Sequence, residues 1–186
     1  MIGIDEVGRG CWAGPLLVVA TRSTSELASS LRDSKKLSKK QRQAMIEGIR
    51  STCDIGEGWV NPSEVDALGL TQAMRLAVER ALTNLSADSG EEIIMDGGIN
   101  YCDDKFTNVT CVIKADDLYP IVSAESIFAK VARDNYMIQI AEKYPGYSFE
   151  SHVGYGTKAH SDALKLLGVT DIHRLSYKPI KALINL

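Results

Sequence analysis

Three of the predicted strands of this sequence end at acidic residues, whose side chains could together bind a metal ion. These residues are Asp5 and Glu6, then Asp96, and then Asp116 with Asp117. Ligand sites of α/β proteins form at strand ends because the loops there converge in a crevice. Carboxylates brought together repel one another, and a hard cation such as Mg²⁺ or Mn²⁺ relieves that repulsion. Two such ions can hold the attacking water and the leaving oxygen of a phosphodiester.

Each carboxylate alone has a simpler interpretation, because aspartate is common in turns and at helix caps. Three acidic strand ends in a chain of 186 residues favour a metal site over that alternative. The candidate ligands include no histidine, which favours Mg²⁺ or Mn²⁺ over zinc. The histidines His152, His160 and His173 lie far apart in the sequence, and we assign none of them a catalytic role.

Apolar runs and helical periodicities predict the elements that position these residues. The predicted strands cover residues 2–5, 15–21, 53–60, 92–96 and 109–113. The predicted helices cover residues 38–51, 70–85, 123–143 and 157–167, with a short helix opened by Asn61-Pro62-Ser63 and broken at Gly69. The first helix begins with a capping box, formed by Ser38 and Gln41. Strands that cluster first and then alternate with helices indicate an α/β domain with a mixed sheet.

Composition and charge narrow the class of protein. A hydrophobic content of 45% in 186 residues is enough for one domain with its own core. The net charge of −3 gives no global sign of nucleic-acid binding, so any basic patch must be local. The four cysteines are scattered without a C-x-x-C pair, and we expect free, mostly buried thiols. The apolar runs are too short to cross a membrane and no leader is recognisable, so we expect a cytoplasmic protein.

Motifs along nearly the whole chain resemble the ribonuclease HII family, in the order of that family. They are residues 5–10 (Asp-Glu-Val-Gly-Arg-Gly), 13–15 (Ala-Gly-Pro), 33–37 (Asp-Ser-Lys-Lys-Leu), 95–97 (Met-Asp-Gly), 114–116 (Lys-Ala-Asp), 123–134 (Ser-Ala-Glu-Ser-Ile-Phe-Ala-Lys-Val-Ala-Arg-Asp), 154–158 (Gly-Tyr-Gly-Thr-Lys) and 173–176 (His-Arg-Leu-Ser). The resemblance implies a ribonuclease H-like fold, a mixed five-stranded sheet flanked by helices. It also implies that Asp5, Glu6, Asp96 and Asp116 are the catalytic residues and the ligands of Mg²⁺ or Mn²⁺.

Some positions depart from the family pattern or leave a choice open. The family usually has Ala at the position of Val7 and a small residue at the position of Glu125. Neither departure replaces a ligand, but a carboxylate at Glu125 would alter the electrostatics if it faces the site. Asp117 is the alternative to Asp116 if the ligand has been placed one residue early.

Substrate recognition is expected in two glycine-containing segments. Gly8, Arg9 and Gly10 would let the backbone approach a sugar closely, as the family does at the 2′-hydroxyl that distinguishes RNA from DNA. Tyr155, between two glycines, would stack on a sugar or base at the junction between a ribonucleotide and a deoxynucleotide. The alternatives are an ordinary glycine turn and a tyrosine that covers the edge of the core.

Basic residues offer further phosphate contacts. Lys35 aligns with the family lysine and is our choice, although its neighbours also suit a solvated loop and helix start. Lys130 and Arg133 are three residues apart on one predicted helix, and they would either line the same groove or lie on the surface.

The expected activity follows from the resemblance. It is hydrolysis of the RNA strand of RNA/DNA hybrids and incision 5′ of single ribonucleotides in duplex DNA, leaving 3′-hydroxyl and 5′-phosphate ends. We expect a monomer whose residues 1–186 form one catalytic domain, with a small helical appendage from about residue 145 to 186. The alternatives are another nuclease of the same fold, such as a resolvase or ribonuclease HIII, and a non-catalytic nucleic-acid-binding domain.

Overall fold

A computed structural model describes residues 1–25, 27 and 37–184 of the chain. Its strands are β1 (Ile2–Val7), β2 (Leu16–Ser23), β3 (Cys53–Val60), β4 (Ile93–Asp96) and β5 (Val109–Val112). Its helices are α1 (Lys39–Thr52), α2 (Pro62–Leu68), α3 (Leu70–Asn84), α4 (Ala115–Leu118), α5 (Pro120–Ala141), α6 (Phe149–His152), α7 (Lys158–Leu167) and α8 (Lys178–Ile184).

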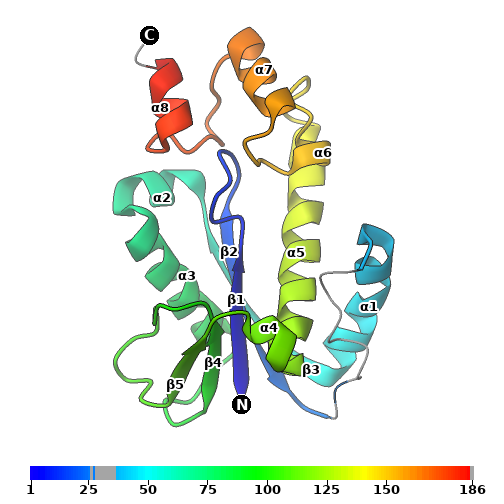
Figure 1. The fold of residues 1–186 in the computed structure, drawn as a ribbon, viewed down its shortest axis with the longest axis vertical. Helices are drawn as coiled ribbons and strands as arrows, with labels where there is room; N and C mark the ends of the chain where they lie inside the picture. Colours follow the sequence, from blue (N-terminus) through cyan, green and yellow to red (C-terminus); the bar gives the residue numbers. More distant parts are fainter. Residues whose placement is uncertain (26, 28–36, 185–186) are drawn as a thin grey trace.

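The strands form one mixed sheet in the order β3-β2-β1-β4-β5 (Figure 1). β1 pairs antiparallel with β2, and β2 pairs antiparallel with β3. β4 pairs parallel with β1 and with β5. The predicted α/β fold with a mixed five-stranded sheet flanked by helices is therefore confirmed.

Helices cover both faces of the sheet. The side chains of Ile2 and Ile4 pack with α3 in one hydrophobic cluster. Leu17 and Val19 point to the opposite face, where they pack with α1 and α5. This alternation along β1 and β2 is the period of two that a strand imposes on its side chains. The central strands are consequently buried on both sides, which gives the site a rigid base.

The last three helices gather at one end of the molecule, with α6 and α7 beside the C-terminal end of α5 and α8 on the side of α2 (Figure 1). They have their own hydrophobic cluster, in which Phe149, Leu164 and Ile180 pack with Met137 of α5 and with Ala13. Ala13 belongs to the turn between β1 and β2, so this C-terminal segment packs directly on the loop that follows the first acidic residues.

Several element boundaries differ from the predictions in informative ways. β1 continues to Val7 because it pairs with β2 as far as Val7 and Leu17, so Asp5 and Glu6 lie inside the strand instead of at its end. α5 begins at Pro120, a residue favoured in the first turn of a helix, and not at Ser123. The short helices α4, α6 and α8 were not predicted, because four to seven residues carry no clear periodicity.

The predicted thiols and cap are confirmed. All four cysteines are free within the described part of the chain, and Cys111 alone is only partly buried. Ser38 and Gln41 form the capping box at the start of α1. Among the described residues, no helix has both the length and the apolar character needed to cross a membrane.

Candidate active site

Asp5 and Asp96 lie on neighbouring parallel strands at the same edge of the sheet. The β1–β4 register pairs Ile4 with Met95, and the two aspartates are the next residues on each strand. Ile4 and Met95 both belong to the cluster on the α3 face. Since side chains alternate along a strand, Asp5 and Asp96 both point to the α5 face.

Asp96 also fixes the position of Asp116. Its Oδ1 accepts a hydrogen bond of 2.7 Å from the backbone N–H of Ala115, the first residue of α4. Lys114, just before it, has a left-handed backbone with φ of 61° that turns the chain into this helix. Asp116 follows directly and is 4% exposed, and its backbone carbonyl accepts a hydrogen bond from the Ser123 hydroxyl. The predicted ligand Asp116 is therefore beside Asp96, whereas Asp117 is exposed.

Burial and mutual repulsion alter the acidity of the first two carboxyl groups. Burial, the charge of Glu6 and the charge of Asp96 raise the pKa of Asp5 to about 7, against the hydrogen bond that Asp5 accepts from the backbone N–H of Glu6. Burial also raises the pKa of Glu6, although Arg9 opposes the shift through a 3.3 Å ion pair. Burial is the largest cause of both shifts, and the charge of Asp96 adds to each of them.

Glu125 adds a fifth carboxyl group to this neighbourhood. It lies on α5, is 0% exposed, and neither of its carboxylate oxygens has a hydrogen-bond partner among the described residues. Burial raises its pKa well above the ordinary value, and the charges of Asp5, Glu6, Asp96 and Asp116 add to the shift. Glu125, where this sequence departs from the family pattern, therefore faces the candidate ligands.

The donor set suits a hard divalent cation, because it consists of carboxylate oxygens and includes an orphaned buried carboxyl group. Within the described ranges, however, no three acidic, histidine or cysteine side chains are already arranged to hold a metal ion. Two present contacts explain this. Asp96 is bonded to the Ala115 amide, and Glu6, on the other face of β1 by alternation, is paired with Arg9.

The Gly8–Arg9–Gly10 segment forms the turn after β1. Gly8 has φ of +83°, and a Cβ there would lie 2.1 Å from Nε of Arg133, so this position requires glycine. Arg9 exposes its side chain, while its carbonyl accepts hydrogen bonds from Arg174 Nη1 at 2.9 Å and Tyr177 Oη at 2.6 Å. A Cβ at Gly10 would meet no described atom within 4 Å, which leaves its backbone open to a ligand.

Tyr155 lies in the loop between α6 and α7, as predicted, and is 40% exposed. Its ring lies near the Arg133 guanidinium, with 6.0 Å between Cζ and the ring centroid. Trp12 and Gly156 meet next to it, and a Cβ on Gly156 would lie 2.1 Å from the Trp12 ring. The tyrosine and the Gly8–Gly10 turn are thus joined through Arg133. Lys35 lies outside the described residues.

Arg133 does not line a groove or the surface, contrary to both of the alternatives predicted for it. It is 0% exposed and donates to the carbonyls of Pro15, Val153 and Ala13 at 2.9, 2.9 and 3.2 Å. Lys130, one turn earlier, is partly exposed and pairs with Asp134 at 3.3 Å. Arg133 is therefore a structural residue that holds the turn after β1 against the C-terminal segment.

The three histidines, far apart in the sequence, form one buried group. Nε2 of His160 and Nε2 of His173 are 3.0 Å apart, and the rings of His152 and His160 are stacked with centroids 4.6 Å apart. Nδ1 of His173 accepts from the Thr170 amide, and Nδ1 of His160 bonds to the Tyr155 carbonyl at 3.0 Å. Burial lowers the pKa of His173 to about 4 and also lowers that of His160, so burial favours the neutral form of both rings. No sequence motif indicated this group.

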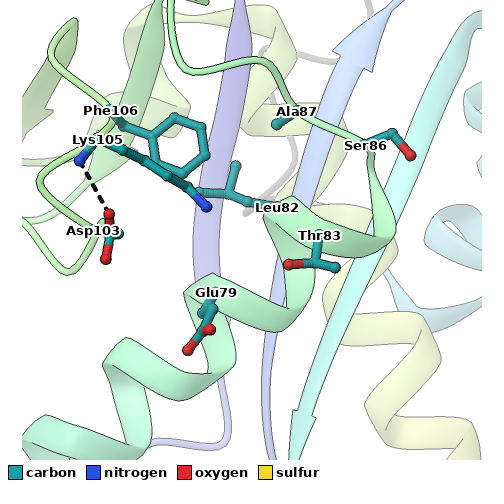
Figure 2. A pocket seen from close by; sticks show the side chains of 8 residues that line it. All are labelled: Glu79, Leu82, Thr83, Ser86, Ala87, Asp103, Lys105 and Phe106. Carbon is teal, nitrogen blue, oxygen red and sulfur yellow. Dashed lines mark hydrogen bonds between the residues drawn. The ribbon is translucent and has the colours of Figure 1, made fainter.

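Figure 2 shows a pocket that does not belong to this site. It lies between the C-terminal end of α3 and the 97–108 connection, and none of its lining residues is a predicted site residue. They are Glu79, Leu82, Thr83, Ser86, Ala87, Asp103, Lys105 and Phe106.

Comparison with known proteins gives a consistent result. The family model described as Ribonuclease HII matches residues 2–180. Ribonuclease HII from Wolbachia sp. subsp. Brugia malayi is 41% identical over 180 residues, which cover 96% of this chain and 87% of that protein. The ribonuclease HII of a solved complex with PCNA from Archaeoglobus fulgidus has a TM-score of 0.81 at 26% identity, covering 98% of this chain and 95% of that one.

A more distant solved structure, Bst ribonuclease HIII in complex with Mn²⁺, has a TM-score of 0.74. It is 20% identical and covers 99% of this chain and 68% of that one, and it supports the fold alone.

Proposed function

This chain belongs to the ribonuclease HII family, and we propose that Asp5, Glu6, Asp96 and Asp116 form its catalytic, metal-binding site. The protein is an enzyme, a ribonuclease H that cleaves the RNA strand of RNA/DNA hybrids as an endonuclease. The proposed finer specificity is incision 5′ of a single ribonucleotide in duplex DNA, leaving a 3′-hydroxyl and a 5′-phosphate.

One observation carries the assignment of the site. Asp5 and Asp96 follow a paired position on adjacent parallel strands, and the bond from Ala115 to Asp96 brings α4 and its buried Asp116 beside them. The charges of Glu6 and Asp96, which add to burial in raising the pKa of Asp5, support the proximity of these carboxyl groups. Glu6 is the least directly supported of the four, since it now pairs with Arg9.

The reaction depends on divalent cations, for which we propose Mg²⁺ or Mn²⁺ and two bound ions. Such ions, when bound, activate the attacking water and stabilise the leaving oxygen. The protein's own part is to supply oxygen ligands and to fix the scissile phosphate among them. Asp96 could keep the Ala115 hydrogen bond at Oδ1 and offer its other oxygen to a cation, whereas Glu6 would hold a cation in place of its ion pair with Arg9.

Recognition of the ribonucleotide is assigned to the surface beside the carboxylates. The backbone of Gly8, Arg9 and Gly10 would approach the sugar, and the Tyr155 ring would stack on the neighbouring nucleotide. The open space at Gly10 and the 40% exposure of Tyr155 support this assignment. Lys35 is proposed as a phosphate contact on the strength of its sequence motif alone.

The proposed partners are RNA/DNA hybrids and ribonucleotide-containing duplex DNA, bound by a monomeric, cytoplasmic protein. Residues 1–186 would act as one catalytic domain, with the helical segment from about 145 onward as its appendage. The separate hydrophobic cluster of that segment supports the division.

An incision assay on two labelled substrates tests the proposal. One substrate is a DNA duplex with a single ribonucleotide, and the other is a continuous RNA/DNA hybrid. With Mg²⁺ or Mn²⁺ we expect cleavage of both, a 3′-hydroxyl at the 5′ side of the ribonucleotide, and no cleavage in EDTA. Cleavage of the hybrid alone would remove the proposed finer specificity, and binding without cleavage of either would favour a non-catalytic domain.

A further inference from the structure

The position of Glu125 follows from the way α5 crosses β1. A Cβ added at Gly3 would lie 3.1 Å from the backbone of Ile121, and one added at Gly8 would touch Arg133. Helix and strand therefore run side by side from Gly3 to Gly8 of β1 and its turn. Glu125 is one helical turn beyond Ile121, level with the middle of this span, where Asp5 points to the same face.

Among the described residues, no group forms a hydrogen bond with the carboxyl group of Glu125. Its neighbours along the helix, Ala124, Phe128 and Ala129, belong to the hydrophobic cluster between α5 and the sheet. A buried polar group without a partner is costly, and an unsatisfied one in a folded protein usually marks a missing ion, water or functional constraint.

Four carboxyl groups of the candidate site act on the charge of Glu125. They are Asp5, Glu6, Asp96 and Asp116. Hydrogen bonding to these carboxylates would leave their combined charge in place, whereas divalent cations bound among them would offset it. Among the described residues, Arg9 is paired with Glu6 at 3.3 Å, and its side chain is partly exposed.

We infer that Glu125 is a fifth carboxylate of the divalent-cation site, which acts from α5 beneath Asp5 to raise the affinity of the site for its cation. This inference rests on the proposed four-carboxylate site. The inference gives a function to a buried carboxyl group that packing does not require. A small residue, as the family usually has here, would be enough for the contact between helix and sheet.

The inference is tested by Mn²⁺ binding, measured by isothermal titration calorimetry on the intact protein without substrate. Glu125→Gln keeps the size of the side chain and removes its charge. We expect its Mn²⁺ dissociation constant to rise about 10-fold to 100-fold, the range found when groups supporting a metal site are changed. We also expect the metal-free melting temperature to stay the same or rise, because a charge repulsion is relieved, and the Mn²⁺-induced increase in melting temperature to shrink.

Glu142→Gln is the matched control. Glu142 is an exposed residue at the end of the same helix, 17 residues on and therefore about 25 Å away along the axis. It makes the same change in net charge and should leave Mn²⁺ affinity unaltered. Glu125→Ala, which places a small side chain in the same position, should reproduce the loss of affinity if Glu125→Gln proves hard to purify.

The outcomes separate the inference from the proposal it rests on. Tight Mn²⁺ binding by the unaltered protein with less than a threefold change in Glu125→Gln would overturn the role of Glu125 and leave the four-carboxylate site standing. No Mn²⁺ binding by the unaltered protein would overturn both.

Discussion

At the scale of single residues, Asp5 and Asp96 are expected to be indispensable for cleavage. Asp5→Asn or Asp96→Asn removes negative charge that holds the cations, which is worth several kcal/mol in the transition state and corresponds to a loss of roughly 10²–10³ in rate. Single-turnover cleavage of a hybrid at saturating Mg²⁺ measures the effect.

The same variants should fold normally. Asn at position 96 can still accept the Ala115 hydrogen bond through its side-chain oxygen, and Asn at position 5 relieves the repulsion that raises the pKa of Asp5. Circular dichroism and metal-free melting temperature check this. Near-normal turnover in either variant would remove that residue from the ligand set.

The adjacent aspartates provide a second residue-scale prediction. Asp116 is buried beside Asp96, whereas Asp117 is exposed on the outer side of α4. Asp116→Asn should therefore reduce the rate by about 10² or more, and Asp117→Asn by less than about threefold. Comparing the two variants in one incision assay decides the register, because the reverse ranking would place the ligand at Asp117.

The third prediction concerns Tyr155, which is expected to bind the substrate without taking part in the hydrolysis itself. If its ring stacks on a nucleotide, Tyr155→Ala removes about 1–3 kcal/mol of binding, a loss of roughly tenfold to hundredfold in kcat/KM. The loss should be larger on the single-ribonucleotide duplex than on a continuous hybrid, where several registers can bind. Tyr155→Phe should keep most activity because stacking needs only the ring.

The melting temperature is the control for this prediction. Tyr155 is 40% exposed and lies in a loop, so Tyr155→Ala should change stability little. A large fall in melting temperature with equal losses on both substrates would show a structural tyrosine instead.

At the scale of elements, the turn after β1 combines a folding role with a recognition role, and its two glycines separate them. Gly8→Ala forces a side chain onto Arg133 at a positive φ, and we expect a loss of stability of at least about 1–3 kcal/mol. Gly10→Ala meets open space, so its melting temperature should change little while activity falls if a sugar approaches the backbone there. Thermal melting and incision assays on both variants provide the comparison. Equal stability in the two variants would contradict the packing of Gly8 on Arg133.

The sequence predicted those elements whose pattern is local. β3 and the capping box of α1 were located correctly because alternation and capping depend on neighbouring residues. Asp5 and Asp96 were expected to lie close together because ligand sites form at strand ends, and the parallel pairing of β1 with β4 places them at the same edge. In contrast, the bond from Ala115 to Asp96 and the burial of Arg133 depend on contacts across 19 or more residues, which no periodicity reveals.

At the scale of the whole molecule, the C-terminal segment and the sheet are joined at the turn after β1. Arg174 donates to the carbonyls of Gly14 and Arg9, and Asp66 of α2 accepts from the amides of Leu175 and Ser176. The histidine group stiffens the same segment through the Tyr155 carbonyl. Since the proposed recognition residues lie on both sides of this junction, its integrity should affect substrate binding as well as stability.

The pH dependence of the metal-free protein's stability should reflect two opposing sets of groups. The pKa of Asp5 is raised from 3.8 to about 7, so between these values the folded state binds more protons than the unfolded state and gains stability as the pH falls. Glu6 and Glu125, whose pKa values are also raised, act in the same direction. Burial and the neighbouring His160 lower the pKa of His173 from 6.5 to about 4, so in that range its contribution to stability is lost as the pH falls.

Asp5→Asn removes one member of the first set and leaves the histidines. We compare the slope of the unfolding free energy against pH between pH 4.5 and 6.5. This slope should be more positive in Asp5→Asn than in the unaltered protein, by up to about 1.4 kcal/mol per pH unit. Urea denaturation at several pH values in EDTA measures both slopes. Asp104→Asn, at an exposed residue of the 97–108 connection, should keep the original slope. Parallel curves for Asp5→Asn and the unaltered protein would show that Asp5 ionises normally in the folded state, and that the carboxylates do not repel one another without a cation.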